Sequence, residues 1–192
     1  MNNYEYIIAS LPEITQDGAG TDADAVIEAI RGQLDGSDAG ILDFLLSGFD
    51  PSALCADFYR SAAKSRSRFV REFFAWDRNV RNAKVLYLNR ALGRPEMQDV
   101  LLLDEDEVPG DFEDSDKAEA ALGTDGILER ERALDNLMWE KSAELTMLDI
   151  FSLDMVLSFV VRLKTADRWS RLDPETGKRM LRSLVEEIRK TK

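Results

Sequence analysis

The stretch 52–93 constrains the fold more than any other part of this sequence, because it contains no proline and no glycine before Gly93. Its apolar residues follow one another at alternating steps of four and three, interrupted on their line only by Arg66; they are Cys55, Tyr59, Ala62, Phe69, Phe73, Trp76, Val80, Ala83 and Tyr87. A mean step of 3.5 places such residues on one side of an α-helix. At 1.5 Å per residue a continuous helix over this stretch would be roughly 60 Å long. The pattern therefore predicts one long helical strut, with Cys55 buried on its apolar stripe.

Helical patterns also cover most of the remaining chain. Capping residues followed by apolar residues at helical spacing predict helices over about 21–34, 38–47, 125–148, 152–163 and 173–190, with N-caps at Thr21 or Asp22, Asp38, Ser152 and Asp173. Asp50 and Pro51 form a similar start signal for the long helix, and Gly93 a stop signal. Residues 4–11 are compatible with a short strand or a helical turn. The last predicted helix, over 173–190, carries Met180, Leu181, Leu184, Val185 and Ile188 on one face.

These patterns predict an all-α fold, an elongated helical bundle built on two long antiparallel helices. The stripe over 125–148, with Ile127, Leu134, Met138, Leu145 and Leu148, supplies a partner for the stripe over 52–93. Between them, residues 94–123 surround Pro109 and Gly110 with acidic side chains. Such a run repels itself and is typical of a solvated connection. We therefore predict one elongated helical domain over 1–192, in which an acidic linker at about 94–123 divides an N-terminal from a C-terminal half.

The charge of the chain alternates along its length. The formal net charge is −12, but the four successive segments 1–50, 51–100, 101–150 and 151–192 carry −9, +5, −12 and +4. One interpretation is that acidic and basic segments neutralise each other in the fold. The other is that a basic helix face or an acidic lobe meets a partner of opposite sign. Nucleic acid is a poor partner for so acidic a chain.

The absence of histidine excludes several kinds of chemistry. Histidine is the commonest general base near neutral pH and the commonest ligand of transition metals. No phosphate-binding glycine motif occurs, and the acidic run lacks the register of a calcium loop. We therefore expect no enzyme, no cofactor and no metal site. The alternative is a carboxylate-based magnesium enzyme or hydrolase, for which Glu140 and Glu144 share one helix face.

Cellular location also follows from what the sequence lacks. The sequence contains no run of about eighteen apolar residues, which a membrane-spanning helix would need. Its first residues also lack the basic region of a signal peptide. The single cysteine, Cys55, fits a reducing compartment. We expect a cytoplasmic protein without direct membrane insertion.

A partner interface is the remaining kind of functional site. Basic residues cluster along 64–84, and two tryptophans fall near the edges of helix faces, where an amphipathic ring can meet a partner. The candidate interface residues are Arg66, Arg71, Arg78, Arg81, Trp139 and Trp169. For Trp139 and Trp169, covering the edge of the core is the alternative role.

Two stretches carry a resemblance to a known family. The run Phe151–Lys164, FSLDMVLSFVVRLK, resembles the C-terminal helix of the C-type stalk subunit in V-type and archaeal-type rotary ATPases. The opening Tyr4–Pro12, YEYIIASLP, resembles the start of a short bacterial family associated with such ATPases. Thr165 and Asp167 stand where the longer family has glutamates. This chain is also much shorter than a full stalk subunit of that type, which is built from three related helical units.

This resemblance implies a mechanical role. The chain would be a non-catalytic coupling component of a V-type rotary ATPase that moves protons or other ions. Its partners would be the central stalk and the membrane ring, which would place it at the inner membrane through that complex. The alternative is a cytoplasmic coiled-coil adaptor or regulatory protein that acts through helix–helix contacts.

Overall fold

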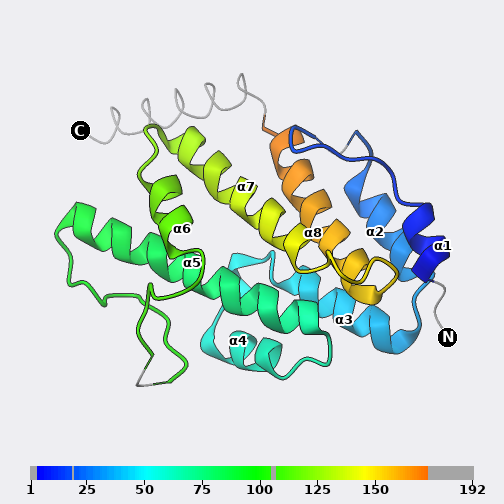
Figure 1. The fold of residues 1–192 in the computed structure, drawn as a ribbon, viewed down its shortest axis with the longest axis horizontal. Helices are drawn as coiled ribbons and strands as arrows, with labels where there is room; N and C mark the ends of the chain where they lie inside the picture. The colour runs from blue at the N-terminus through cyan, green and yellow to red at the C-terminus, as the bar shows by residue number, and fades with distance from the viewer. Residues whose placement is uncertain (1–3, 19, 105–106, 173–192) are drawn as a thin grey trace, which may run out of the picture.

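The computed structural model describes residues 4–18, 20–104 and 107–172, and in this part of the chain the protein is all-α, as predicted (Figure 1). Apart from one isolated bridge between Thr15 and Gly18, it contains no β-structure there. The helices are α1 (Tyr4–Ala9), α2 (Ala23–Arg31), α3 (Gly36–Ser47), the 3₁₀ turn η1 (Pro51–Ala53), α4 (Ala56–Ala63), α5 (Arg68–Leu92), α6 (Ser115–Leu122), α7 (Ile127–Glu144) and α8 (Leu153–Ser170). The helix predicted over 173–190 lies outside the described residues.

The predicted strut over 52–93 is wrong as one continuous helix, because the chain breaks it at residues 64–67 into α4 and α5. A continuous helix would turn the charged side chain of Arg66 towards the core. Instead, Arg66 lies in the connection and pairs with Asp38 of α3. The new helix start is stabilised by Ser67, whose Oγ accepts a hydrogen bond from the backbone N–H of Val70 at 3.1 Å. α4 then packs against α5, with the rings of Phe58 and Phe74 edge to face at 4.8 Å.

Most of the predicted apolar stripe is nevertheless buried. Tyr59, Ala62, Phe69, Phe73, Trp76 and Val80 are buried, and Ala83 and Tyr87 are half-buried. Cys55 is the exception: it is exposed at the position just before α4, so the prediction of a buried cysteine is wrong. The stripe was predicted correctly because burial depends on local spacing, which a break between two helices leaves intact on either side.

α8 lies at the centre of the molecule. It buries residues around most of its circumference, including Val156, Leu157, Val160, Val161 and Leu163, which is typical of a helix surrounded by others. α7 and α8 lie side by side and antiparallel, and α5 passes beneath them (Figure 1). α1 and α2 cover the side of α8 away from α7, and α3 passes below the start of α8. The main partner of α7 is thus α8, and not α5 as the sequence indicated.

Three of the predicted helix ends are confirmed, and the predicted cap of α3 is displaced by three residues. Asp22 caps α2, Ser152 caps α8, and Gly93 ends α5 with a left-handed φ of 63°, as predicted. The cap of α3 is Asp35, not Asp38, because the side chain of Asp35 accepts from the backbone N–H groups of Ser37 and Asp38. The carboxylate of Asp38 instead pairs with Arg66 and accepts from the hydroxyl of Tyr4.

Residues 94–123, interpreted as an acidic linker, are fastened to α5. The buried side chain of Asn82 exchanges hydrogen bonds of 2.9 and 3.0 Å with the backbone of Leu101. The amide of Asn89 donates to the carbonyls of Glu96 and Gln98 at 2.9 and 2.7 Å. The segment is therefore packed against the bundle and not a purely solvated connection.

Gly48, at the end of α3, lies close to the ring of Phe74 in α5, so a substitution there tests how tightly these two helices pack. A Cβ atom at Gly48 would lie 2.4 Å from Cε1 and Cζ of the buried Phe74 ring. We expect Gly48→Ala to lower the free energy of unfolding by about 1–2 kcal/mol through overpacking, as measured by urea denaturation. Gly32→Ala is the matched control, because Gly32 also ends a helix with a right-handed φ but meets nothing closer than 3.5 Å. Equal effects of the two substitutions would contradict the close approach.

Candidate functional site

The loop between α7 and α8 exposes the largest concentration of apolar side chains in the described part of the chain. Residues 145–152, here called the apolar loop, include four large apolar residues whose exposed fractions run from about half to nearly complete; these are Met147 at 72%, Leu148 at 93%, Ile150 at 54% and Phe151 at 53%. Contiguous exposed apolar surface of this kind marks contact sites in soluble proteins.

The apolar loop is held in place by hydrogen bonds. Thr146 is buried, and its hydroxyl donates to the carbonyl of Ala143 at 3.1 Å. The backbone N–H of Asp149 donates a hydrogen bond to the carbonyl of Thr146 at 3.2 Å, and the hydroxyl of Ser152 donates one to the carbonyl of Asp149 at 3.0 Å. The four apolar side chains are therefore presented by a defined backbone.

The base of the apolar loop is joined to the start of α5. Asp154, in the first turn of α8, accepts hydrogen bonds from the hydroxyl of Ser67 at 2.8 Å and from the backbone N–H of Phe69 at 3.3 Å. The guanidinium of Arg68 donates to the carbonyl of Leu145 at 2.7 Å. These contacts bring two segments together that lie about eighty residues apart in the sequence.

Basic side chains accompany this junction. Residues 64–71, here called the basic turn, carry Lys64, Arg66, Arg68 and Arg71, of which the first three are exposed. Arg66 pairs with Asp38, and its side chain is still 57% exposed. Arg71 donates to the carbonyl of Ser65 at 2.6 Å and so stabilises the turn itself. The junction thus combines an apolar projection with positive charge on a chain whose net charge is −12.

Two of the predicted interface residues, Arg66 and Arg71, belong to the basic turn, while Arg78 and Arg81 face other groups of α5 and its neighbours. Arg78 is buried and forms a bidentate ion pair with Glu107, in which Nη1 of Arg78 lies 2.8 Å from Oε2 of Glu107. Arg81 donates from Nε to Asp77 at 2.7 Å. Acidic and basic segments do pair with each other in the fold, as Arg78–Glu107, Lys84–Glu131 and Lys164–Asp24 illustrate.

Of the two predicted interface tryptophans, Trp139 lies on α7 and Trp169 on α8. Trp169 is near the end of α8 that is away from the apolar loop. Trp169 donates from Nε1 to Asp135 at 2.6 Å, and the guanidinium of Arg132 lies 4.6 Å from its ring centroid. Burial raises the pKa of Asp135 more than Arg168 and this hydrogen bond lower it. Arg162 similarly lies 5.7 Å from the ring centroid of Trp139. Both rings are half-buried beneath arginine side chains.

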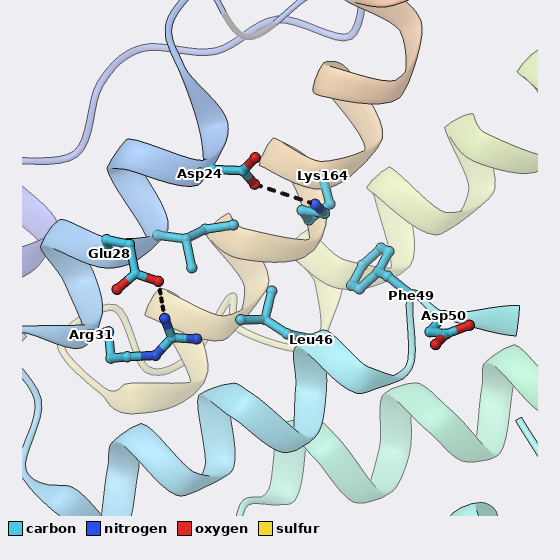
Figure 2. A pocket seen from close by; sticks show the side chains of 8 residues that line it. Asp24, Glu28, Arg31, Leu46, Phe49, Asp50 and Lys164 are labelled. Atoms are coloured by element: carbon cyan, nitrogen blue, oxygen red, sulfur yellow. Dashed lines mark hydrogen bonds and ion pairs between the residues drawn. The ribbon is translucent and has the colours of Figure 1, made fainter. Parts of the chain in front are cut away.

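A pocket of about 420 Å³ opens between α2, α3 and α8, and Figure 2 shows the side chains that line it. Its charged groups are engaged with each other or with neighbouring residues. Arg31 pairs with Glu28 and with Asp43, and Nζ of Lys164 lies 3.8 Å from Asp24. A ligand entering here would have to displace these ion pairs, so the pocket is a weaker candidate than the apolar loop.

Glu140 and Glu144, the two glutamates of the carboxylate alternative, both lie on α7. Among the described residues no group of three or more acidic or cysteine side chains lies close enough together to hold a metal ion. Glu144 accepts from Nζ of Lys141 at 3.2 and 3.3 Å, while Glu140 is exposed. None of the helices that the structure describes is both long and apolar enough to cross a membrane.

Sequence reasoning missed the apolar loop because it extended the stripe of 125–148 through it. α7 ends at Glu144, which leaves Leu148 exposed, and Ile127 at the other end of the stripe is 82% exposed as well. The sequence carries no clear signal of the loop, because Met147, Leu148, Ile150 and Phe151 would fall within an arc of about 160° on a continued helix.

Residues 46–192 match the family model described as "Protein of unknown function (DUF2764)". No match is found among the curated proteins or among the solved structures. The resemblance to the stalk component of rotary ATPases is therefore wrong as a family assignment, because the matching model is this one and no family of that component matches. The stretch 151–164 that carried the resemblance forms most of the central helix α8, whose apolar composition follows from its burial.

Proposed function

The chain belongs to the DUF2764 family, and from its surface we propose that it is a cytoplasmic, non-catalytic adaptor that binds a protein partner through the apolar loop and the basic turn. The observation that carries this proposal is the ordered exposure of Met147, Leu148, Ile150 and Phe151. The partner would be a protein that offers an apolar groove with acidic residues at its rim.

The apolar side chains would supply most of the affinity. Fully burying one Leu, Ile, Met or Phe side chain contributes about 1.5–3 kcal/mol, and a few such residues dominate most protein interfaces. Because hydrogen bonds already hold the loop backbone, little conformational entropy would be lost on binding. This favours the apolar loop as a preformed contact.

The basic turn would orient the partner. Charges at the rim of an interface mainly increase the association rate and select partners of opposite sign. Lys64, Arg66 and Arg68 are exposed beside the loop on an otherwise acidic molecule, so they would select an acidic rim.

We expect Leu148→Ser to abolish or strongly weaken co-purification of the partner with the tagged full-length chain, because Leu148 is 93% exposed and structurally dispensable. Quantitative mass spectrometry of proteins recovered from native cells gives the measurement. Ile127→Ser is the matched control: Ile127 is 82% exposed at the opposite end of α7, and this variant should retain the partner.

Three outcomes would count against the adaptor. The same proteins could be recovered with both variants, which would place the contact elsewhere. Vesicles containing anionic lipid could bind the wild-type chain and not Leu148→Ser, which would assign the loop to a membrane surface. Tight binding of magnesium in a calorimeter would favour the carboxylate enzyme.

The narrower expectation, a coupling role between the stalk and membrane ring of a rotary ATPase, stays a prediction. The same recovery experiment tests it when native membranes are first dissolved in detergent. Rotary motor proteins that are lost specifically with Leu148→Ser would support this role, and their absence would leave the general adaptor as the proposal.

A further inference from the structure

The pocket between α2, α3 and α8 combines an apolar lining with a few charged side chains. Ile27 of α2, Leu46 of α3 and Phe49, which follows α3, supply the apolar part. Ile27 is buried, and Leu46 and Phe49 are half-buried against the hydrophobic core. Pockets of several hundred Å³ with this combination are typical of sites for small molecules. At about 420 Å³ this pocket has room for such a ligand.

The walls of the pocket are already joined to each other. Arg31 of α2 donates from Nε and from Nη2 to Oδ1 of Asp43 in α3, at 2.9 and 2.6 Å. Arg31 also pairs with Glu28 of its own helix. With two acidic partners, Arg31 serves the wall and not the ligand. A pocket whose walls are fixed in this way loses little conformational entropy when a ligand binds.

The ion pair between Lys164 and Asp24 is looser. Nζ of Lys164 lies 3.8 Å from Oδ1 of Asp24, which is beyond the range of a hydrogen bond. The two side chains are 27% and 69% exposed, and Oδ2 of Asp24 lies 3.6 Å from a second cation, Arg171. Exposed pairs of this kind contribute little to stability. A ligand can therefore enter between Lys164 and Asp24 at low cost.

The charges of the lining favour a ligand that carries both signs. The lining includes three carboxylates, those of Asp24, Glu28 and Asp50. These repel a simple anion, while Lys164 repels a simple cation. A zwitterion supplies a carboxylate for Lys164 and an ammonium group for Asp24, so neither charge is left without a counter-ion. The 3.8 Å between Nζ and Oδ1 is close to the separation of the two charged groups in an α-amino acid, which are attached to one carbon atom.

We propose that this pocket binds a free α-amino acid with an apolar side chain. The carboxylate of the ligand pairs with Lys164, and its ammonium group pairs with Asp24. Its side chain lies against Ile27, Leu46 and Phe49. Figure 2 shows Asp24 and Lys164 directed toward one another, with Leu46 and Phe49 below them in this view. This inference does not depend on the partner of the apolar loop.

Titration of the isotope-labelled full-length chain with L-leucine, followed by two-dimensional NMR of the backbone amides, tests the site. Two analogues are matched to this probe: L-leucinamide lacks the carboxylate, and 4-methylpentanoate lacks the ammonium group. We expect saturable shifts with L-leucine at the amides of Leu46, Phe49 and Lys164. Each analogue should bind at least about tenfold more weakly, because it loses one charge-assisted contact.

A pair of variants locates the contact. Lys164→Gln should weaken the binding of L-leucine about tenfold, because the ligand carboxylate loses its cation. Lys84→Gln is the matched control and should bind as the wild type does. Lys84 is also a partly exposed lysine in an ion pair between helices, with Glu131 of α7, but it lies outside the pocket.

The absence of saturable shifts in the wild-type chain at about 10 mM L-leucine would overturn the proposal. Equal affinity for L-leucine and either analogue would also overturn it, because one of the two ligand charges would then play no part. Equal weakening in the two lysine variants would place the contact outside the pocket. Circular dichroism of both variants separates a loss of binding from unfolding.

Discussion

Replacing Glu107 by alanine is expected to lower the free energy of unfolding by about 3 kcal/mol, because it leaves a buried guanidinium without its counter-ion. The side chain of Arg78 is only 10% exposed, and its Nε already lacks a hydrogen-bond partner within the described residues. Glu107 also accepts from the backbone N–H of Leu103 at 3.0 Å. Chemical denaturation followed by circular dichroism gives the measurement.

Two further variants make this prediction specific. Asp57→Ala removes an acid that pairs with Arg60 on the surface, where both side chains are more than half exposed, and should leave the stability almost unchanged. The double variant Arg78→Met with Glu107→Leu should recover most of the loss, because no uncompensated charge then remains. A double variant as unstable as Glu107→Ala would show that shape, and not charge, holds residues 94–114 on α5.

Replacing Asp114 by alanine should lower the free energy of unfolding by about 2–3 kcal/mol, since several groups depend on this buried carboxylate. Asp114 accepts a hydrogen bond from Nε1 of Trp76 at 3.0 Å and one from Lys117 at 2.7 Å. Nζ of the buried Lys141 lies 3.4 Å away. Asp114→Asn keeps an acceptor for Trp76 and should therefore cost less than Asp114→Ala in the same denaturation assay.

The contribution of Asp114 should also depend on pH. Burial by itself would raise the pKa of Asp114, but the hydrogen bond from Lys117 and the charge of Lys141 outweigh it, so the pKa lies below its usual 3.8. The folded state then binds this proton less tightly than the unfolded state. The stabilisation is present above the usual pKa and is lost as the pH falls through the lowered value. The stability advantage of wild type over Asp114→Asn should therefore shrink between about pH 5 and about pH 2. A constant difference over this range would contradict an ionised Asp114 in the fold.

Local signals predicted the helices well where the determining contacts lie within one turn. The caps at Asp22 and Ser152 and the stop at Gly93 depend on a side chain or a φ angle next to the helix end. The break after α4 was missed although Ser67 is a local cap, because the pairing of Arg66 with Asp38 of another helix is not visible in the sequence. The candidate site was missed for a related reason: the end of α7 at Glu144 is coupled to contacts with α5 and α8.

The sequence by itself determined that this protein is all-α and that one apolar stripe on α4 and α5 is largely buried, because both follow from the spacing of apolar side chains along one segment. What it first indicated as a single strut over 52–93, the tertiary structure resolved into two helices packed on each other. Only the tertiary structure decided that α8 is central, that residues 94–123 are fastened to α5, and that the apolar loop stands beside the basic turn. These depend on contacts between residues far apart in the chain, whose energies no local pattern contains.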